Sequence, residues 1–206
     1  TPGGPRAIDL ERFGGELDHL FTLVRGDLWS LPPFNSADPA FRRVVDVAFA
    51  GDGEPTSAPE FPAAAGLTRE RMEAYGLSVP LRLLTNATLL HRGGVRQALP
   101  RFDELWCKLD AGTAKYFHRV DGTRLPFPRI LKNLADTARE RPIVVQAMFL
   151  RLDGEPPSGA ERDAWAGRLA EIAAVGTIAA VQVYTVSRRP ASATVAALEP
   201  PELEDI

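Results

Sequence analysis

The feature that most constrains the fold is an alternation of short apolar segments with amphipathic ones. Apolar segments with strand character occur at residues 42–50, 80–90, 103–111, 143–152 and 179–190. Segments with helical spacing lie between them, such as 159–176, which ends at Gly176. Strands that alternate with helices form parallel sheets joined by right-handed crossovers. The sequence therefore predicts an α/β fold, either a doubly wound open sheet or an open or partial barrel.

The spacing of apolar residues also predicts where the helices lie. They are expected at 8–26, 60–77, 92–102, 114–122, 126–142 and 159–176, with a last one started by prolines in 199–206. A break is expected near Gly66, since glycine disfavours a helix interior. The proline-rich segment 28–41 is expected to be a loop. Several strands are continuous apolar runs, which predicts burial of both sheet faces.

Length and charge narrow the class of protein. The chain has 206 residues and no internal linker, which predicts a single domain with a sizeable core. No apolar run reaches the roughly 18–20 residues that cross a bilayer, and the start of the chain lacks a signal-peptide core. We expect a soluble, cytoplasmic protein without a membrane partner. The net charge of −3, from 24 Lys and Arg against 27 Asp and Glu, does not support nucleic-acid binding.

Cysteine and histidine usage predicts no metal site within this chain. The one cysteine, Cys107, excludes an intrachain disulfide and a thiolate-held cluster built from this chain alone. Its place in an apolar strand predicts a small core side chain. His19, His91 and His118 are widely spaced and form no local metal-binding pattern.

Polar residues gather at the carboxyl end of every predicted strand. In chain order they are the segment Gly51-Asp52-Gly53-Glu54-Pro55-Thr56, then Thr85-Asn86, Lys108 and Asp110, Gln146 and Arg151, and finally Gln182, Tyr184, Thr185 and Ser187. Parallel α/β folds bind their ligands beyond these strand ends. The pattern therefore predicts a ligand site at that edge of the sheet.

Two of these strand ends leave alternatives open. Lys108 and Asp110 lie on the same side of their strand, because strand side chains alternate with period two. They form either an internal ion pair or part of a binding site. The glycines of Gly51-Asp52-Gly53-Glu54 allow a ligand to approach the backbone, and the carboxylates favour a cation such as an ammonium over a phosphate. The same segment is equally typical of a turn that ends a strand.

Taken together, the strand ends resemble a known family. The segments "AFAGDGEPT", "LLTNATLL", "KLDAG", "VVQAMFL" and "VQVYTVSRRP", in this order, are similar to the radical S-adenosylmethionine (radical SAM) superfamily. The similarity is to the bacterial branch whose second strand ends in a Gly-Asp-Gly-Glu-Pro-Thr version of the family's GGE motif. It covers residues 9–206 and implies a partial, six-stranded (β/α)6 barrel.

The resemblance also implies a cofactor site. The GGE segment of the family binds the methionyl ammonium of S-adenosylmethionine, a role that falls here on Gly51, Asp52, Gly53 and Glu54. Polar residues of the later strands contact the ribose and the carboxylate, and the last strand packs near the adenine. The matching residues here are Asn86, Lys108, Asp110, Gln146 and Tyr184.

A departure from the family limits what this chain does alone. The CxxxCxxC motif that holds the 4Fe–4S cluster is absent, and so is the first barrel strand. We expect residues 1–206 to be an N-terminally incomplete radical SAM core, inactive alone. The other interpretation is a homologue that has naturally lost the cluster.

In the intact parent, the resemblance implies an enzyme that uses a 4Fe–4S cluster and an external electron donor. It would cleave S-adenosylmethionine to a 5′-deoxyadenosyl radical that acts on an unknown small molecule, peptide or RNA.

Two other functions fit the residues. One is a cluster-less binding or scaffold protein. The other is a lyase that forms a Schiff base with its substrate on Lys108.

Overall fold

The computed structural model describes residues 7–51, 53–190 and 192–206. The chain separates into two compact units, each with its own internal contacts. The first comprises residues 1–84 and 91–104, and the second comprises residues 85–90 and 105–206. The parallel strands follow the order β1-β2-β3-β4-β6. The predicted α/β class is confirmed.

In the part of the chain that the structure describes, the first unit contains three helices and two paired strands. They are α1 (Leu10–Arg25), α2 (Phe61–Ala74), α3 (Gly93–Ala98), β1 (Val47–Phe49) and β2 (Leu81–Thr85), whose last residue belongs to the second unit. β1 runs parallel to β2, with Val47 opposite Leu81. The segment 28–41 forms short 3-10 turns, as expected of a loop.

Local signals in the first unit mostly act as predicted. α1 begins after Asp9, whose carboxylate accepts hydrogen bonds from two backbone N–H groups of the first turn. The break expected near Gly66 is wrong, because α2 runs through it. Glycine is useful there for packing, since a Cβ atom would lie 3.3 Å from Nε of Arg101.

An aromatic cluster fills the core of the first unit. The rings of Phe61 and Phe102 stack with centroids 5.7 Å apart. Phe49 meets Phe61 and Phe102 edge-on, at 5.9 and 5.3 Å. Edge-on and stacked aromatic pairs are favourable beyond the area they bury. This cluster fixes β1, and with it the loop that follows Phe49.

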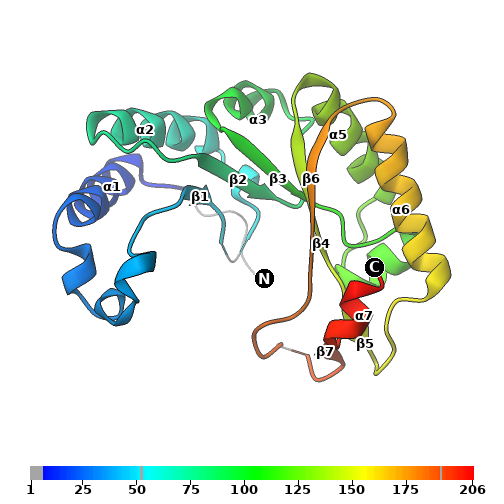
Figure 1. Ribbon diagram of the computed structural model, residues 1–206. Coiled ribbons are helices and arrows are strands. Elements are labelled where there is room, and N and C mark those ends of the chain that lie inside the picture. Colours follow the sequence, from blue (N-terminus) through cyan, green and yellow to red (C-terminus); the bar gives the residue numbers. More distant parts are fainter. Residues whose placement is uncertain (1–6, 52, 191) are drawn as a thin grey trace. The chain divides into compact units, whose positions relative to one another are not determined.

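The second unit contains the remaining parallel strands and four helices. Its elements are β3 (Glu104–Lys108, whose first residue belongs to the first unit), α4 (Ala114–Val120), α5 (Phe127–Glu140), β4 (Ile143–Met148), α6 (Gly159–Ala173), β6 (Ile178–Tyr184) and α7 (Pro200–Glu204). In Figure 1, α5 and α6 lie side by side next to β4 and β6. The tail helix α7 begins with a capping box between Glu199 and Glu202.

The segment 143–152, predicted as one strand, forms two. β4 ends at Met148, and β5 (Leu150–Leu152) pairs antiparallel with β7 (Val195–Ala197). Because β4 and β5 are both apolar, the apolar pattern of the sequence does not show that the strand is interrupted at Phe149. A small antiparallel pair therefore follows the parallel sheet in this unit.

The expectation that both sheet faces are buried is wrong. Along β3, Leu105 and Cys107 are fully buried, whereas Trp106 and Lys108 are only partly buried. β4 repeats the alternation at its carboxyl end, where Ala147 is buried between partly exposed neighbours. One face carries the apolar core, and the opposite face carries Trp106, Lys108, Gln146, Gln182 and Tyr184. We call the latter the open face.

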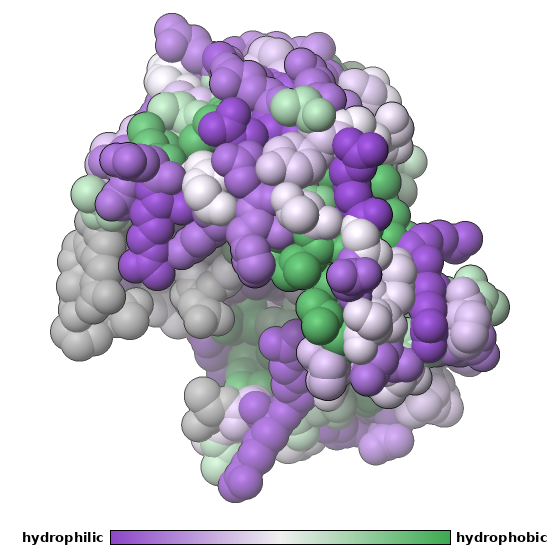
Figure 2. Space-filling model, turned by 90° about the vertical axis from the view of Figure 1, so that its left-hand side faces the viewer, coloured by the Kyte–Doolittle hydropathy of each residue, from purple (hydrophilic) through white to green (hydrophobic). Residues whose placement is uncertain are grey.

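The described helices do not resemble membrane spans. None of them is both long enough and apolar enough to cross a bilayer. Hydrophilic side chains predominate on the face drawn in Figure 2, where hydrophobic ones form small groups among them.

A close backbone contact in the second unit depends on glycine. A Cβ atom at Gly112 would lie 2.1 Å from the backbone nitrogen of Trp165 in α6. We predict that Gly112→Ala lowers the free energy of unfolding by about 3 kcal/mol or more, because α6 must move away. Urea denaturation followed by circular dichroism measures this change.

Gly159→Ala is the matched control, since a Cβ atom there contacts nothing. Equal stability of the Gly112→Ala variant and the wild type would show that the contact between residue 112 and α6 is not tight.

Candidate functional site

The predicted ligand loop follows β1 in the first unit and borders a pocket. Gly51, Gly53, Glu54 and Pro55 line an open hollow of about 310 Å³, whose other walls come largely from apolar residues such as Phe13. Asp52, also predicted to bind the ligand, lies outside the described residues. The loop therefore presents backbone to a cavity, as a ligand loop requires.

Neither described glycine of this loop is needed for packing within the protein. A Cβ atom at Gly51 or Gly53 would contact nothing, and neither residue has the positive φ that favours glycine. Both residues are exposed. With packing and backbone conformation excluded, close approach of a ligand to the backbone remains a physical reason for glycine at these positions.

The side chain of Glu54 orders the loop. Its Oε1 accepts hydrogen bonds from the backbone N of Thr56 at 3.2 Å and from Thr56 Oγ1 at 2.5 Å. These contacts cap the 3-10 turn Pro55–Ser57. The role of Glu54 toward an ammonium stays a prediction.

In the second unit, three predicted residues share one cavity. Asn86, Lys108 and Asp110 line a cavity of about 220 Å³. Its other walls are Thr88, Leu109, Phe117, Asp121, Thr123, Leu125 and Ile130. Asn86 thus meets Lys108 and Asp110, which lie 22 and 24 positions further along the chain, as expected for residues at the ends of parallel strands.

Asn86 is held by a turn that closes β2. Its Oδ1 accepts hydrogen bonds from the backbone N and the hydroxyl of Thr88, at 3.1 and 2.7 Å. Ala87, between them, has a φ of +62°, which is uncommon for a residue with a Cβ atom. Asn133 of α5 fixes this backbone by donating to Ala87 O at 2.7 Å. Asn86 is therefore built into a rigid strand end.

Lys108 and Asp110 form the ion pair that the sequence left as one alternative. Lys108 Nζ lies 2.9 Å from Asp110 Oδ2. Asp110 is 2% exposed, and its Oδ1 accepts a hydrogen bond from Met148 N at 2.8 Å. The pair also borders the cavity, so the ion pair and a binding role are compatible.

Asp121, at the end of α4, is a cavity residue that sequence reasoning missed. Burial of its carboxyl and the charge of Asp110 raise its pKa to about 7, while Lys108 acts in the opposite direction. The residue as a whole is exposed at the cavity mouth, so water screens part of this effect. Its sequence context, Asp-Gly after a helix, is typical of a turn and lies far from any strand end.

Charge also changes the titration of Lys108 and Tyr184. Burial alone lowers the pKa of Lys108, but Asp110 and further negative groups raise it above its ordinary value. Burial raises the pKa of Tyr184, and Asp110 raises it further. Lys108 is therefore a charged ammonium at neutral pH, and the phenol of Tyr184 keeps its proton.

Gln146 and Tyr184 lie on the open face, where they were predicted to contribute. Gln146 is opposite Lys108 in the β3–β4 register, and its Nε2 donates to Gln182 Oε1 at 2.6 Å. Their contribution to ligand binding stays a prediction.

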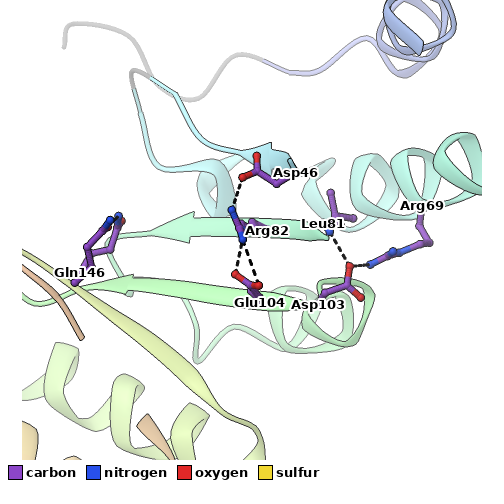
Figure 3. Close-up of polar contacts among 8 residues, drawn as sticks. Asp46, Arg69, Leu81, Arg82, Asp103, Glu104 and Gln146 are labelled. Atoms are coloured by element: carbon purple, nitrogen blue, oxygen red, sulfur yellow. Dashed lines mark hydrogen bonds and ion pairs between the residues drawn. The ribbon is translucent and has the colours of Figure 1, made fainter. Parts of the chain in front are cut away.

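A second polar cluster, in the first unit, ties strands together. Arg82 lies between Asp46 and Glu104 and pairs with both (Figure 3). Asp103 accepts hydrogen bonds from Arg69 and from the backbone N of Leu81, at 2.8 and 2.7 Å. Each charge in this cluster has an opposite partner, so we assign it a structural role.

The described residues offer no resident metal site, since no group of three His, Cys, Asp or Glu could hold an ion. Cys107 is fully buried, as predicted for a core side chain. No protein-family model matches the sequence, and no curated protein matches it either.

The raised pKa of Asp121 predicts a pH-dependent stability. A carboxyl whose pKa rises from 3.8 in the unfolded chain to about 7 in the fold loses stability as pH rises between these values. Asp121→Asn removes the titrating group. The melting temperature of the variant relative to wild type should therefore increase from pH 4 to pH 7 and then level off.

Thermal unfolding at pH 4, 5, 6, 7 and 8 measures this difference. Asp163→Asn, an exposed carboxyl on α6, serves as control and should show no such trend. A constant difference between Asp121→Asn and wild type would contradict the shifted pKa.

Proposed function

We propose that this chain is the core of a radical SAM enzyme that binds S-adenosylmethionine at the carboxyl ends of its parallel strands. The observation that carries the proposal is the convergence of Asn86, Lys108 and Asp110 on one cavity. These are the residues that the family resemblance assigns to the ribose and carboxylate of the cofactor. The exposed glycines 51 and 53 add support, because they favour a ligand at the loop after β1.

The strand arrangement supports a partial (β/α)6 barrel rather than a doubly wound sheet. The strands follow the chain order without reversal, whereas a doubly wound sheet reverses direction at its switch point. In the second unit, one face holds the apolar core and the other is polar and partly exposed. A barrel interior that holds a ligand has this character.

The chain's own residues would bind and orient the cofactor. Lys108, as a charged ammonium, suits the methionyl carboxylate. Asn86 and Asp110 offer acceptors for ribose hydroxyls, and Tyr184 offers a protonated phenol and an aromatic ring near the adenine. The family resemblance assigns the methionyl ammonium to Gly51 and Gly53 of the first unit.

The iron–sulfur cluster does not fit this chain. A 4Fe–4S cluster needs several thiolates, and Cys107 is the one cysteine, fully buried in the sheet. In the proposed enzyme, the cluster ligands therefore come from residues outside these 206. A cluster held by those residues would supply the electron for S-adenosylmethionine cleavage.

The titration of Lys108 argues against the lyase alternative. A Schiff-base lysine must lose its proton to attack a carbonyl, and enzymes achieve this by lowering its pKa. Here Lys108 pairs with Asp110, and the pKa of Lys108 is raised rather than lowered. The geometry therefore favours Lys108 as an electrostatic partner of a ligand over Lys108 as a nucleophile.

Two substitutions test the loop. In the full-length, cluster-loaded protein, we predict that Gly53→Val weakens S-adenosylmethionine binding at least about tenfold, because its side chain occupies the space the ligand needs. Glu54→Ala should weaken binding less, through loss of the cap on the turn. Isothermal titration calorimetry measures both affinities.

Gly15→Val is the matched control, because a Cβ atom at this exposed position of α1 also contacts nothing. If Gly53→Val and Glu54→Ala both bind S-adenosylmethionine as tightly as wild type, the loop is a strand-ending turn and the cofactor assignment is wrong.

A further inference from the structure

The cavity of the second unit has a rim that neither the strand ends nor the family resemblance assigns. Asp121, Thr123 and Leu125 line it from the loop between α4 and α5. The loop turns at Gly122, whose φ is +58°. Thr123 Oγ1 accepts from Leu125 N at 3.2 Å, and His118 Nε2 lies 3.0 Å from Leu125 O. These contacts order the loop next to Asp121, whose own backbone N donates to Phe117 O at 3.0 Å.

The charges around the cavity leave one carboxyl in excess. Lys108 balances Asp110, which is buried and fixed by Met148 N. Asp121 is the second carboxyl of the cavity, and the charge of Asp110 acts on it. Tyr184 of β6 also interacts electrostatically with Asp121. The residue that α5 contributes to the cavity wall is the apolar Ile130.

This charge distribution favours a cationic group beside Asp121. An anionic group can contact Lys108 only while Lys108 stays paired with buried Asp110, because separating a buried ion pair is costly. A cation meets Asp121, a second carboxyl that Lys108 does not neutralise while it pairs with Asp110. The cation replaces the proton of Asp121, so the cavity stays neutral.

The apolar walls and the volume of the cavity determine the size and character of the uncharged part of the ligand. Phe117, Leu125 and Ile130 line the cavity beside the charged groups. Its volume of about 220 Å³ holds roughly seven water-sized groups at about 30 Å³ each. A short apolar body that ends in a charged group fits both the size and the lining.

We propose that Asp121 makes this cavity selective for a protonated amine on a short apolar body, and that such a group displaces the proton of Asp121. The amine enters as an ammonium ion, the carboxyl of Asp121 releases its proton to solvent, and the two form an ion pair. The inference goes beyond the proposed function, because it concerns the group next to Lys108 and Asp110 regardless of which larger molecule carries it.

The titration of Asp121 supports this exchange. With a pKa of about 7, the carboxyl is about half protonated at neutral pH. A neighbouring cation favours the ionised form and lowers this value. Amine binding is therefore expected to strengthen as pH rises through 7.

The test compares pentan-1-amine with pentan-1-ol, which has the same apolar body without the charge. Both are titrated into the 206-residue chain and followed by ¹H–¹⁵N NMR at pH 6 and pH 8. For the amine, we expect the dissociation constant to fall about tenfold between these values, as the ionised fraction of Asp121 rises. Binding of the alcohol should not change.

Asp121→Asn should abolish both the preference for the amine and its pH dependence, whereas Asp163→Asn should preserve them. Equal binding of amine and alcohol, pH-independent amine binding or no binding of either would overturn the proposal.

A measurement on the unaltered protein guards against misfolding of the variant. In a ¹³C NMR titration, the carboxyl of Asp121 should show a lower pKa with pentan-1-amine present, and an unchanged pKa would overturn the proposal. If the unaltered protein binds S-adenosylmethionine but does not prefer the amine, this inference alone is refuted. If it prefers the amine but does not bind S-adenosylmethionine, the proposed function alone is refuted.

Discussion

The ion pair between Lys108 and Asp110 is the interaction on which the candidate site depends. Asp110 is almost fully buried, a position that a carboxylate occupies only with partners. Lys108 and the backbone N of Met148 supply them and tie the end of β3 to β4. Asp110 also keeps Lys108 charged, and burial together with the charge of Asp110 raises the pKa of Asp121. The Lys108–Asp110 ion pair therefore contributes both to the stability of the sheet and to the electrostatics of the cavity.

The alternation of side chains along the parallel strands explains why polar groups gather on one face. Cys107 and Val145 are buried in the apolar core, while Lys108 and Gln146, one residue further along each strand, point to the open face. A sheet buried on both faces would exclude such residues. Here the open face is polar and partly exposed, as expected for a surface that receives a ligand.

Sequence patterns predicted the elements and the strand-end residues, because both follow from local rules. Apolar spacing located α5 and α6, and Asn86, Lys108 and Asp110 were brought together because they follow neighbouring parallel strands. Three features had no local signal. The split between β4 and β5 lies within an apolar run, the open face depends on which helices cover the sheet, and Asp121 enters the cavity from a loop whose position is set by tertiary packing.

The central claim is that the strand ends serve a radical SAM enzyme, and product analysis tests it most directly. The parent protein that the proposal implies is reconstituted with a 4Fe–4S cluster and mixed with S-adenosylmethionine and a low-potential reductant. The products are then separated by liquid chromatography and mass spectrometry. The account predicts 5′-deoxyadenosine and methionine, in amounts that depend on the reductant. Recovery of intact S-adenosylmethionine from a fully loaded protein would contradict it.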